Sequence, residues 1–231
     1  MATTDRYHGP GDLPRDLPLF PLRGAILLPR ATLPLNVFEP RYLAMVDDVM
    51  RGGRLIGIIQ PETPPGTPSD QIVESPIARE SRLKGVGCAG RVTSYQELDD
   101  GRLLITLTGV ARFVVTGEKL SKLPYRTAEV DFSGFASDFA AGLGEDQVDR
   151  EALLRVLRRY LDANRLSADW PSILKSSSEF LVNALSVMSP YGPEEKQALL
   201  EARDLKGRAE VLVALAEMEL AAGSSGGSTI Q

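Results

Sequence analysis

The sequence predicts an α+β fold in which a β-rich part comes first and a helical part follows. Up to about residue 132, short runs of β-branched and apolar residues are broken by Gly and Pro, which is typical of strands and turns. From about residue 146 onwards, apolar residues recur at helical spacing. The chain has 231 residues, of which 43% are hydrophobic and 25% charged, so it is long enough for one large or two small globular domains.

This change of pattern predicts the domain boundaries. The join "FSGFASDFAAGLGED" is rich in Gly, Ala and Ser, and both chain ends are polar. We expect a flexible tail at residues 1–16, a β domain at 17–135 with one helix at 40–51, a linker at 136–146, a helical bundle at 147–222 and a second flexible tail at 223–231.

Prolines shape the predicted elements of the β domain. The runs "LPLFPL" (17–22) and "ATLPLNVF" (31–38) carry prolines, which remove a ladder donor, so we expect edge strands or extended segments there. The stretch "EPRYLAMVDDVMRGG" has Pro40 in a first helical turn and apolar residues on one face, which indicates a helix ended by Gly52 and Gly53. "RLIGIIQP" is typical of a buried strand. The residues 62–70 indicate an exposed loop whose role stays open.

Three glycines imitate a dinucleotide-binding motif. Gly85, Gly87 and Gly90 have the spacing G-x-G-x-x-G, which in a nucleotide-binding fold lies between a strand and a helix. The residues that follow instead alternate as strands do, with Asp100-Gly101 as a hairpin turn. We therefore interpret the glycines as places where a strand bends or another segment passes close.

The helical part contains four stretches with amphipathic periodicity. They cover residues 149–166, 169–188, 189–202 and 204–220, and we expect three or four helices in them. In the second stretch, we expect a stripe of apolar side chains to face the core: Leu174, Leu181, Leu185 and Met188.

Composition argues against several classes of function. The net charge of −5 and the pI of about 5.1 make a nucleic-acid partner improbable on electrostatic grounds. Cys88 is the single cysteine, so no intramolecular disulfide can form and we expect a cytoplasmic protein. The N-terminus lacks the apolar core of a secretory signal and no apolar run is long enough for a membrane helix, so we expect neither a signal peptide nor a spanning helix. The single histidine, His8, lies in the predicted tail, which disfavours a catalytic triad or a histidine zinc site.

Other short motifs have ordinary structural interpretations. Ser172 and Lys175 match S-x-x-K, but the partner motifs of that hydrolase class are missing. Asp47-Asp48 and Asp99-Asp100 lack the spacing of a metal site, so we expect no metal and no cofactor. Cys88 lies in a predicted strand and fits a small buried apolar residue better than a reactive thiol.

Long stretches of the chain carry a family resemblance. "LPLFPLRGAILLPRATLPLNVFEPRYLAMV" and "LIGIIQP" resemble the opening of the Lon-protease N-terminal, or substrate-binding, domain in the form found in stand-alone bacterial proteins. "GVGCAGRVTSYQELDDGRLLITLTGVARFVV" is similar to its central strands, and "PYGPEEKQALLEARDLKGRAEVLVALAEME" to its C-terminal helices.

The resemblance implies a PUA-like β pseudobarrel followed by a small helical bundle. In full-length Lon proteases this module precedes an ATPase and a protease domain and is thought to engage substrate proteins. The sequence contains no G-x-x-x-x-G-K-[ST] loop and ends at the predicted helices, so we expect neither of those domains here.

The segment "NVFEPRY" is the densest candidate binding site. Asn36, Glu39 and Arg41 could form a polar anchor, and Phe38 with Tyr42 could present aromatic surface to a partner. The alternative is that Phe38 and Tyr42 are core residues and that Glu39 and Arg41 tie a strand to the helix.

Arg112 is the remaining candidate contact residue. It follows the predicted bend at Gly109 and either contacts a partner or caps carbonyl groups of the β domain.

These observations favour a non-enzymatic module that binds unfolded or exposed segments of other proteins, in association with a proteolytic system. Edge strands would supply main-chain hydrogen bonds, and apolar pockets would supply loose sequence preference. The alternatives are an RNA-associated PUA-like module and a small-molecule sensor with its site between the β part and the helices. The sequence leaves the partner, the binding surface and the oligomeric state open.

Overall fold

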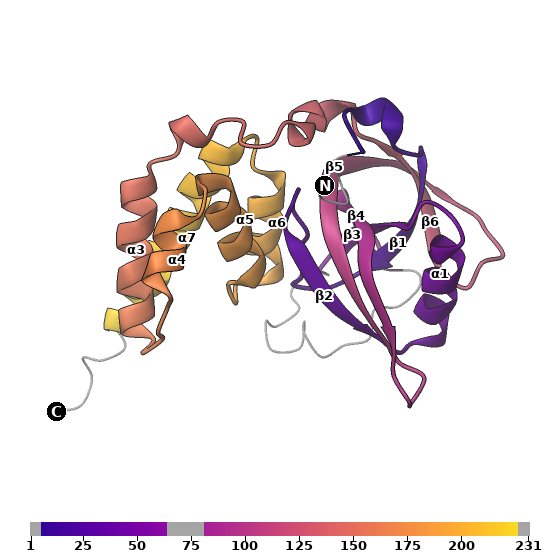
Figure 1. Ribbon diagram of the computed structural model, residues 1–231, viewed down its shortest axis with the longest axis horizontal. Helices are drawn as coiled ribbons and strands as arrows, with labels where there is room; N and C mark the ends of the chain where they lie inside the picture. Colours follow the sequence, from indigo (N-terminus) through magenta and orange to yellow (C-terminus); the bar gives the residue numbers. More distant parts are fainter. Residues whose placement is uncertain (1–5, 64–80, 226–231) are drawn as a thin grey trace.

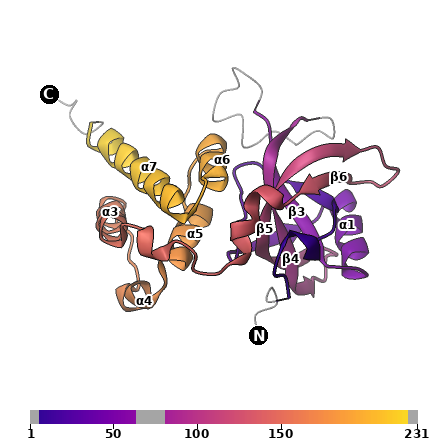
Figure 2. The same ribbon diagram turned by 90° about the horizontal axis from the view of Figure 1, so that it is seen from above.

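A computed structural model describes residues 6–63 and 81–225, the last three as backbone only. It has a β part and a helical part that lie side by side, joined by the segment between β6 and α3 (Figures 1 and 2). No helix in these two ranges is long and apolar enough to cross a membrane.

The β part is one six-stranded mixed sheet that closes into a near-barrel ring. Its strands are β1 (Asp16–Pro21), β2 (Thr32–Val37), β3 (Leu55–Pro61), β4 (Leu83–Glu97), β5 (Leu103–Lys119) and β6 (Arg126–Asp131). Their order is β2-β5-β4-β3-β1-β6, and a second pairing between β5 and β6 closes the ring. Only β1 and β3 pair in parallel; the other pairs are antiparallel. The α+β fold predicted from the sequence is confirmed.

Glycines allow the sheet to close without steric conflict. At Gly109 an added Cβ would lie 1.9 Å from the carbonyl oxygen of Leu28, because the segment before β2 crosses the sheet there. An added Cβ at Gly87 would meet the ring of Phe113 at 2.5 Å. At Gly90 it would meet a methyl group of Leu27, also at 2.5 Å.

The interpretation that another segment passes close to these glycines is therefore confirmed at Gly87 and Gly90 but not at Gly85. All three glycines lie in β4, which continues to Glu97, so the helix that a dinucleotide site needs does not follow. Gly85 faces open space. The predicted turn after β4 is confirmed, and Gly101 has a positive φ of 79°.

The two proline-containing strands differ in their positions. β2 pairs only with β5 among the described strands and is an edge strand, as predicted. The same prediction is wrong for β1, which lies between β3 and β6. Ring closure brings β6 to the side of β1 that would otherwise be free, and this pairing joins residues more than 100 positions apart.

The N-terminal segment packs against the barrel over most of its described length. Tyr7 and Leu13 are both buried in an apolar cluster with Leu17 and Leu55, and a short 3-10 helix (Pro10–Asp12) connects them. The prediction of a flexible tail at residues 1–16 is therefore wrong for residues 7–16, because two apolar side chains anchor this segment.

The described residues of the helical part form five α-helices, one more than the upper expectation. They are α3 (Arg150–Ala163), α4 (Trp170–Lys175), α5 (Ser178–Met188), α6 (Pro193–Glu201) and α7 (Leu205–Ser225), in addition to α1 (Pro40–Met50) in the β part. The predicted helix at 169–188 is divided into α4 and α5. Ser177 is the N-cap of α5, because its hydroxyl oxygen accepts a hydrogen bond from the Phe180 N–H. α7 continues into the tail predicted at 223–231, whose last six residues lie outside the described ranges.

A single apolar cluster joins the two parts. It contains barrel residues such as Ile58 and Leu107 together with helical residues such as Leu181, Leu199 and Leu212. The predicted linker at 136–146 lies within this junction rather than outside it. Its Asp138 is buried and forms an ion pair with Arg112 at 2.8 Å.

Arg112 connects three segments of the chain. Its backbone N–H and its guanidinium donate to Asp138, and Nη1 also donates to the carbonyl oxygens of Leu200 and Ala202 at the end of α6. Arg112 is 2% exposed. The buried charge is thus matched by one carboxylate and two carbonyl groups.

We predict that Arg112→Ala lowers the free energy of unfolding by about 3–5 kcal/mol, because it leaves the Asp138 carboxylate buried without its counter-charge. Urea denaturation measures the loss. Arg102→Ala is the control, since its ion pair with Asp100 is about half exposed and removing it costs about 1 kcal/mol or less. Equal losses in the two variants would contradict the assignment.

We predict that Gly109→Ala lowers the free energy of unfolding by about 3 kcal/mol or more, because the new methyl group overlaps a main-chain carbonyl that has no room to move. Gly117→Ala lies in the same strand and faces open space, so it should change stability little. Thermal unfolding of both variants compares them, and a tolerated Ala at position 109 would be inconsistent with the crossing described above.

Candidate protein-binding surface

The free edge of β2 is the first component of the candidate surface. β2 pairs with β5 through six residue pairs, from Thr32 with Thr108 to Val37 with Leu103. No other strand in the described part of the chain pairs with its opposite side. Thr32, Pro34 and Asn36 are exposed. An edge of this kind offers main-chain N–H and C=O groups to a further strand.

An apolar pocket between the start of β2 and α5 is the second component. It has a volume of about 310 Å³. Its walls come from the segment Pro29–Thr32 and from one face of α5, including Phe180, Ala184, Val187 and Met188. Phe180 is 61% exposed and Met188 is 77% exposed. Figure 1 shows β2 as the strand drawn nearest α5 and α6, in keeping with these shared walls.

Polar contacts fix α5 against the barrel and so hold this pocket open. Asn183 donates from Nδ2 to the carbonyl oxygen of Pro29 at 3.1 Å. Arg30 forms an ion pair with Glu179 and also donates to the carbonyl oxygen of Asp138 at 2.6 Å. The pocket is therefore part of the packed junction, and its shape does not depend on a loose loop.

The C-terminal end of α5 is held by a buried lysine. Lys196 is 3% exposed, and its Nζ donates to the carbonyl oxygens of Ser186 at 2.8 Å and Val187 at 2.6 Å. A cation near a helix C-terminus satisfies carbonyl groups that have no partner within the helix. Burial lowers the pKa of Lys196 to about 8. This contact positions Met188 at the mouth of the pocket.

Two of the residues predicted from the sequence lie on the candidate surface. Asn36 is exposed in β2, and Phe38, which follows the strand, is 63% exposed. The alternative that Phe38 is a core residue is wrong. Leu104, opposite Asn36 in the register of β2 and β5, is 40% exposed, so β5 also carries an exposed apolar side chain near this end of β2.

The other residues of "NVFEPRY" have structural contacts. Tyr42 is 5% exposed and packs between Phe20, at 4.2 Å between ring centroids, and the Arg41 guanidinium, at 4.6 Å. Arg41 pairs with Glu39 at 2.7 Å. The prediction that Tyr42 presents aromatic surface is wrong, because its side chain completes the contact of α1 with the sheet.

Arg112 is also not available as a contact residue. Its burial contradicts the prediction that it contacts a partner. The alternative that it caps carbonyl groups holds, but the carbonyls belong to the end of α6 rather than to the β domain.

Sequence reasoning missed the α5 face of the pocket. Met188 was expected in the buried stripe together with Leu174, yet both are exposed, at 77% and 59%. Phe180 lies on the exposed side of α5, although the next two residues, Leu181 and Val182, are buried. A large apolar residue on the polar side of an amphipathic helix was the available signal.

The weaker sequence motifs have ordinary structural contacts. Ser172 donates from its hydroxyl group to Asp169 at 2.5 Å, which caps the start of α4, and both Ser172 and Lys175 are exposed. Cys88 is fully buried, and burial raises the pKa of its thiol. Trp170 stacks with the guanidinium of Arg158, 4.5 Å from the ring centroid, and so joins α4 to α3.

The comparisons with known proteins agree on one family. The family described as the ATP-dependent protease La (LON) substrate-binding domain matches residues 16–217. A Lon protease of Flavobacterium johnsoniae is 26% identical over 206 residues, which are 86% of this chain and 23% of that protein. Lon protease 2 of Myxococcus xanthus is 28% identical over 215 residues, or 88% and 24% of the two chains. The chain thus spans about a quarter of the length of these relatives.

Two solved structures share the fold. A Lon N-terminal domain protein from Xanthomonas campestris aligns with a TM-score of 0.56 and 26% identity, covering 86% of this chain and 97% of that one. The N-terminal domain of a Mycobacterium avium complex Lon protease aligns with a TM-score of 0.60 and 16% identity, covering 87% and 98%.

We predict that Lys196 makes stability depend on pH in the alkaline range. Below about pH 8 it is protonated in the folded and unfolded states alike, and burial of the cation opposes folding. Between about pH 8 and 10.5 only the unfolded chain keeps the proton, so the contribution of Lys196 to the free energy of unfolding rises with pH.

The measurement is urea denaturation of the unaltered protein and Lys196→Met at pH 7.5 and 9.5. The difference between the two proteins should move in favour of the unaltered protein by on the order of 1 kcal/mol. Taking the difference removes the effect of the groups that both proteins share. A difference that is the same at both pH values would contradict the burial of this ammonium group.

Proposed function

We infer a function from the family: this chain belongs to the ATP-dependent protease La (LON) substrate-binding domain family. We propose that it is a non-enzymatic module that binds exposed segments of other proteins. The binding surface would be the free edge of β2 with the pocket between β2 and α5. Its partners would be unfolded or locally unfolded proteins that pass to a proteolytic system.

The observation that carries the proposal is the position of a free strand edge beside an apolar pocket. An extended segment can add to the edge of a sheet through main-chain hydrogen bonds, which require no particular sequence. Side chains on one face of that added strand would point toward α5, where Phe180 and Met188 are exposed. The backbone would supply affinity, and the pocket would favour apolar side chains.

The residues of the surface suit a site with loose specificity. Met188 has an unbranched, flexible side chain that can adapt to different apolar groups. Phe38 and Leu104 add exposed apolar side chains at the other end of β2. Pro34, in the middle of the strand, lacks an N–H group, so a strand added to this edge, whether from a client or from a second copy, pairs with an interruption there.

We predict that Met188→Lys weakens binding of an unfolded client at least about fivefold, because the new ammonium group must be desolvated or leave the pocket. The client is a reduced, carboxymethylated protein that stays unfolded, labelled for fluorescence anisotropy. Phe180→Lys should have a similar effect, since Phe180 lines the same pocket.

Met218→Lys is the matched control. Met218 is 68% exposed on α7 and does not line the pocket, so the same change of charge there should leave the affinity unaltered. If Met188→Lys and Met218→Lys bind the client equally well, the β2–α5 surface is not the binding site.

A further inference from the structure

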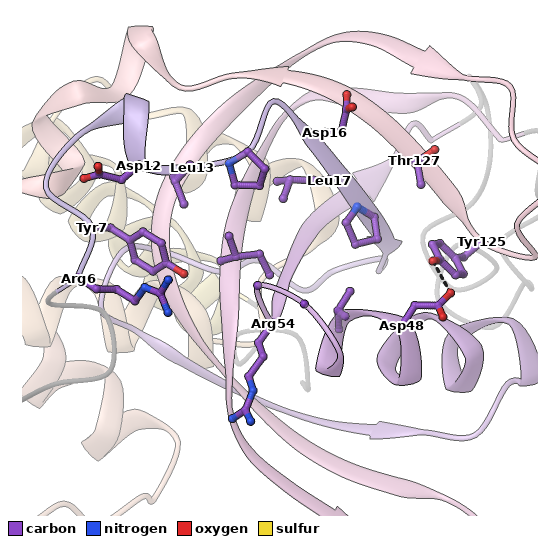
Figure 3. A pocket seen from close by; sticks show the side chains of 16 residues that line it. Arg6, Tyr7, Asp12, Leu13, Asp16, Leu17, Asp48, Arg54, Tyr125 and Thr127 are labelled. Atoms are coloured by element: carbon purple, nitrogen blue, oxygen red, sulfur yellow. Dashed lines mark hydrogen bonds between the residues drawn. The ribbon is translucent and has the colours of Figure 1, made fainter.

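Two other cavities of the described residues differ in how their charges are placed. The larger has a volume of about 650 Å³ and lies between the N-terminal segment and the end of α1 (Figure 3). Every charged side chain in its lining is exposed: Arg6, Asp12, Asp16, Asp48 and Arg54. Water and salt compensate exposed charges, so they do not commit this cavity to a charged ligand.

The smaller cavity lies where the β part meets the helical part and contains buried charges. It has a volume of about 280 Å³. Its walls come from Pro29–Arg30, from β5, from the segment around Asp138, and from α5 and the start of α7. We call it the junction pocket. It borders the pocket of the β2–α5 surface, with which it shares Arg30 and Glu179.

Cations outnumber carboxylates in the lining of the junction pocket. The four cations are Arg30, Arg112, Lys206 and Arg208, and the three carboxylates are Asp138, Glu179 and Asp204. Arg30 pairs with Glu179, and Arg112 pairs with Asp138. Asp204 and Lys206 are both exposed, one charge of each sign, so water compensates them. The charge that remains is the guanidinium of Arg208.

Arg208 is buried without a counter-charge. It is 4% exposed, and it forms no ion pair with another residue of the described ranges. Its Nε donates to the carbonyl oxygen of Leu199 at 2.9 Å, and its Nη1 donates to Oδ1 of Asn183 at 3.1 Å. Both acceptors are neutral. Nη2 is buried and has no hydrogen-bond partner among the described residues.

The guanidinium of Arg208 stays charged although its surroundings oppose the charge. Burial and the neighbouring Arg112 lower the pKa of Arg208 to about 10, so the proton remains bound at neutral pH. A buried cation without a counter-charge destabilises the folded state, and its unpaired N–H groups add to that cost. An anion held in the junction pocket reduces both costs, because Arg208 lines this pocket.

The start of α7 adds further donors beside Arg208. The first N–H groups of a helix have no acceptor within the helix and favour anions. Asp204 accepts from the Gly207 N–H at 2.8 Å. The N–H groups of Leu205 and Lys206, two residues that line the pocket, have no acceptor in the described part of the chain.

We propose that the junction pocket binds a small oxyanion of the phosphate class, as the free ion or as a phosphate monoester, between Arg208 and the first turn of α7. A guanidinium group donates to two oxygens at once, and the amide groups of α7 with the Lys206 ammonium can serve others. Donors of this number favour a tetrahedral anion over a carboxylate, which has two oxygens. The inference is independent of the proposed function, since it concerns another pocket and another kind of ligand.

The test is thermal unfolding of the full chain in sodium phosphate and in sodium chloride of equal ionic strength. With a dissociation constant of about 1 mM, about 20 mM phosphate should raise the melting temperature by about 4 °C, because a ligand of the folded state stabilises it. Phosphate also stabilises proteins by its exclusion from their surface, and variants separate that effect from binding.

Arg208→Met removes the buried cation and keeps a long, unbranched side chain in its place. It should lose the shift that phosphate binding produces and keep only the effect of exclusion. Arg203→Met is the matched control, because Arg203 is exposed, lies shortly before α7 and does not line the pocket. This variant should keep the full shift.

Asp204→Asn tests the site in the opposite direction, and it decides the question if Arg208→Met does not fold. Asn caps a helix as well as Asp does, so α7 is retained. The substitution removes a negative charge from the lining, and the affinity for phosphate should rise about threefold.

An equal phosphate shift in the unaltered protein and in Arg208→Met would overturn the proposal, as would a smaller shift in Asp204→Asn. Sodium acetate that raises the melting temperature as much as phosphate would also overturn it, since the pocket would then hold carboxylates. Glycerol 3-phosphate distinguishes the two sources of the bound group. A shift at least as large as that of inorganic phosphate indicates an ester, and a smaller shift indicates the free ion.

Discussion

The buried ion pair between Arg112 and Asp138 is the interaction on which the arrangement of this protein depends. Arg112 stands in β5, Asp138 in the segment that leaves the β part, and the carbonyl groups that share the guanidinium close α6. The ring of Phe135 covers the guanidinium at 4.4 Å. Burying this charge is costly unless every donor is used, so the three segments must meet in one geometry. Arg30 donates to the carbonyl oxygen of Asp138 and pairs with Glu179 of α5, so the same segment also holds α5 beside the start of β2.

The proposed binding surface follows from how the barrel is closed. Ring closure pairs β5 with β6 and removes most free edges, but it leaves β2 paired on one side only. α5, fixed by Asn183 and by the contact of Lys196 with its last turn, supplies apolar side chains next to that edge. The surface is thus formed where packed elements of the two parts of the molecule meet.

The sequence predicts what local patterns determine and misses what long-range contacts determine. The hairpin of β4 and β5, the helix after Pro40 and the structural nature of Gly87 and Gly90 depend on neighbouring residues, and these were predictable. The internal position of β1 was not, because it requires pairing with β6. Likewise, Tyr7 and Arg112 are buried by segments distant in sequence. The polar residues around Tyr7 wrongly indicated a flexible tail, and the bend before Arg112 wrongly indicated an exposed contact residue. For the candidate surface, Asn36 and Phe38 were found from their residue types, whereas Phe180 and Met188 depended on the packing of α5.

The central claim is that a client segment pairs with the free edge of β2, and amide hydrogen exchange tests it most directly. Exchange is followed by mass spectrometry with and without the unfolded client. The account predicts slower exchange in residues 32–37 and at the end of α5 when the client is bound, with α7 unchanged. Protection confined to other surfaces, with β2 exchanging at the same rate in both states, would contradict it.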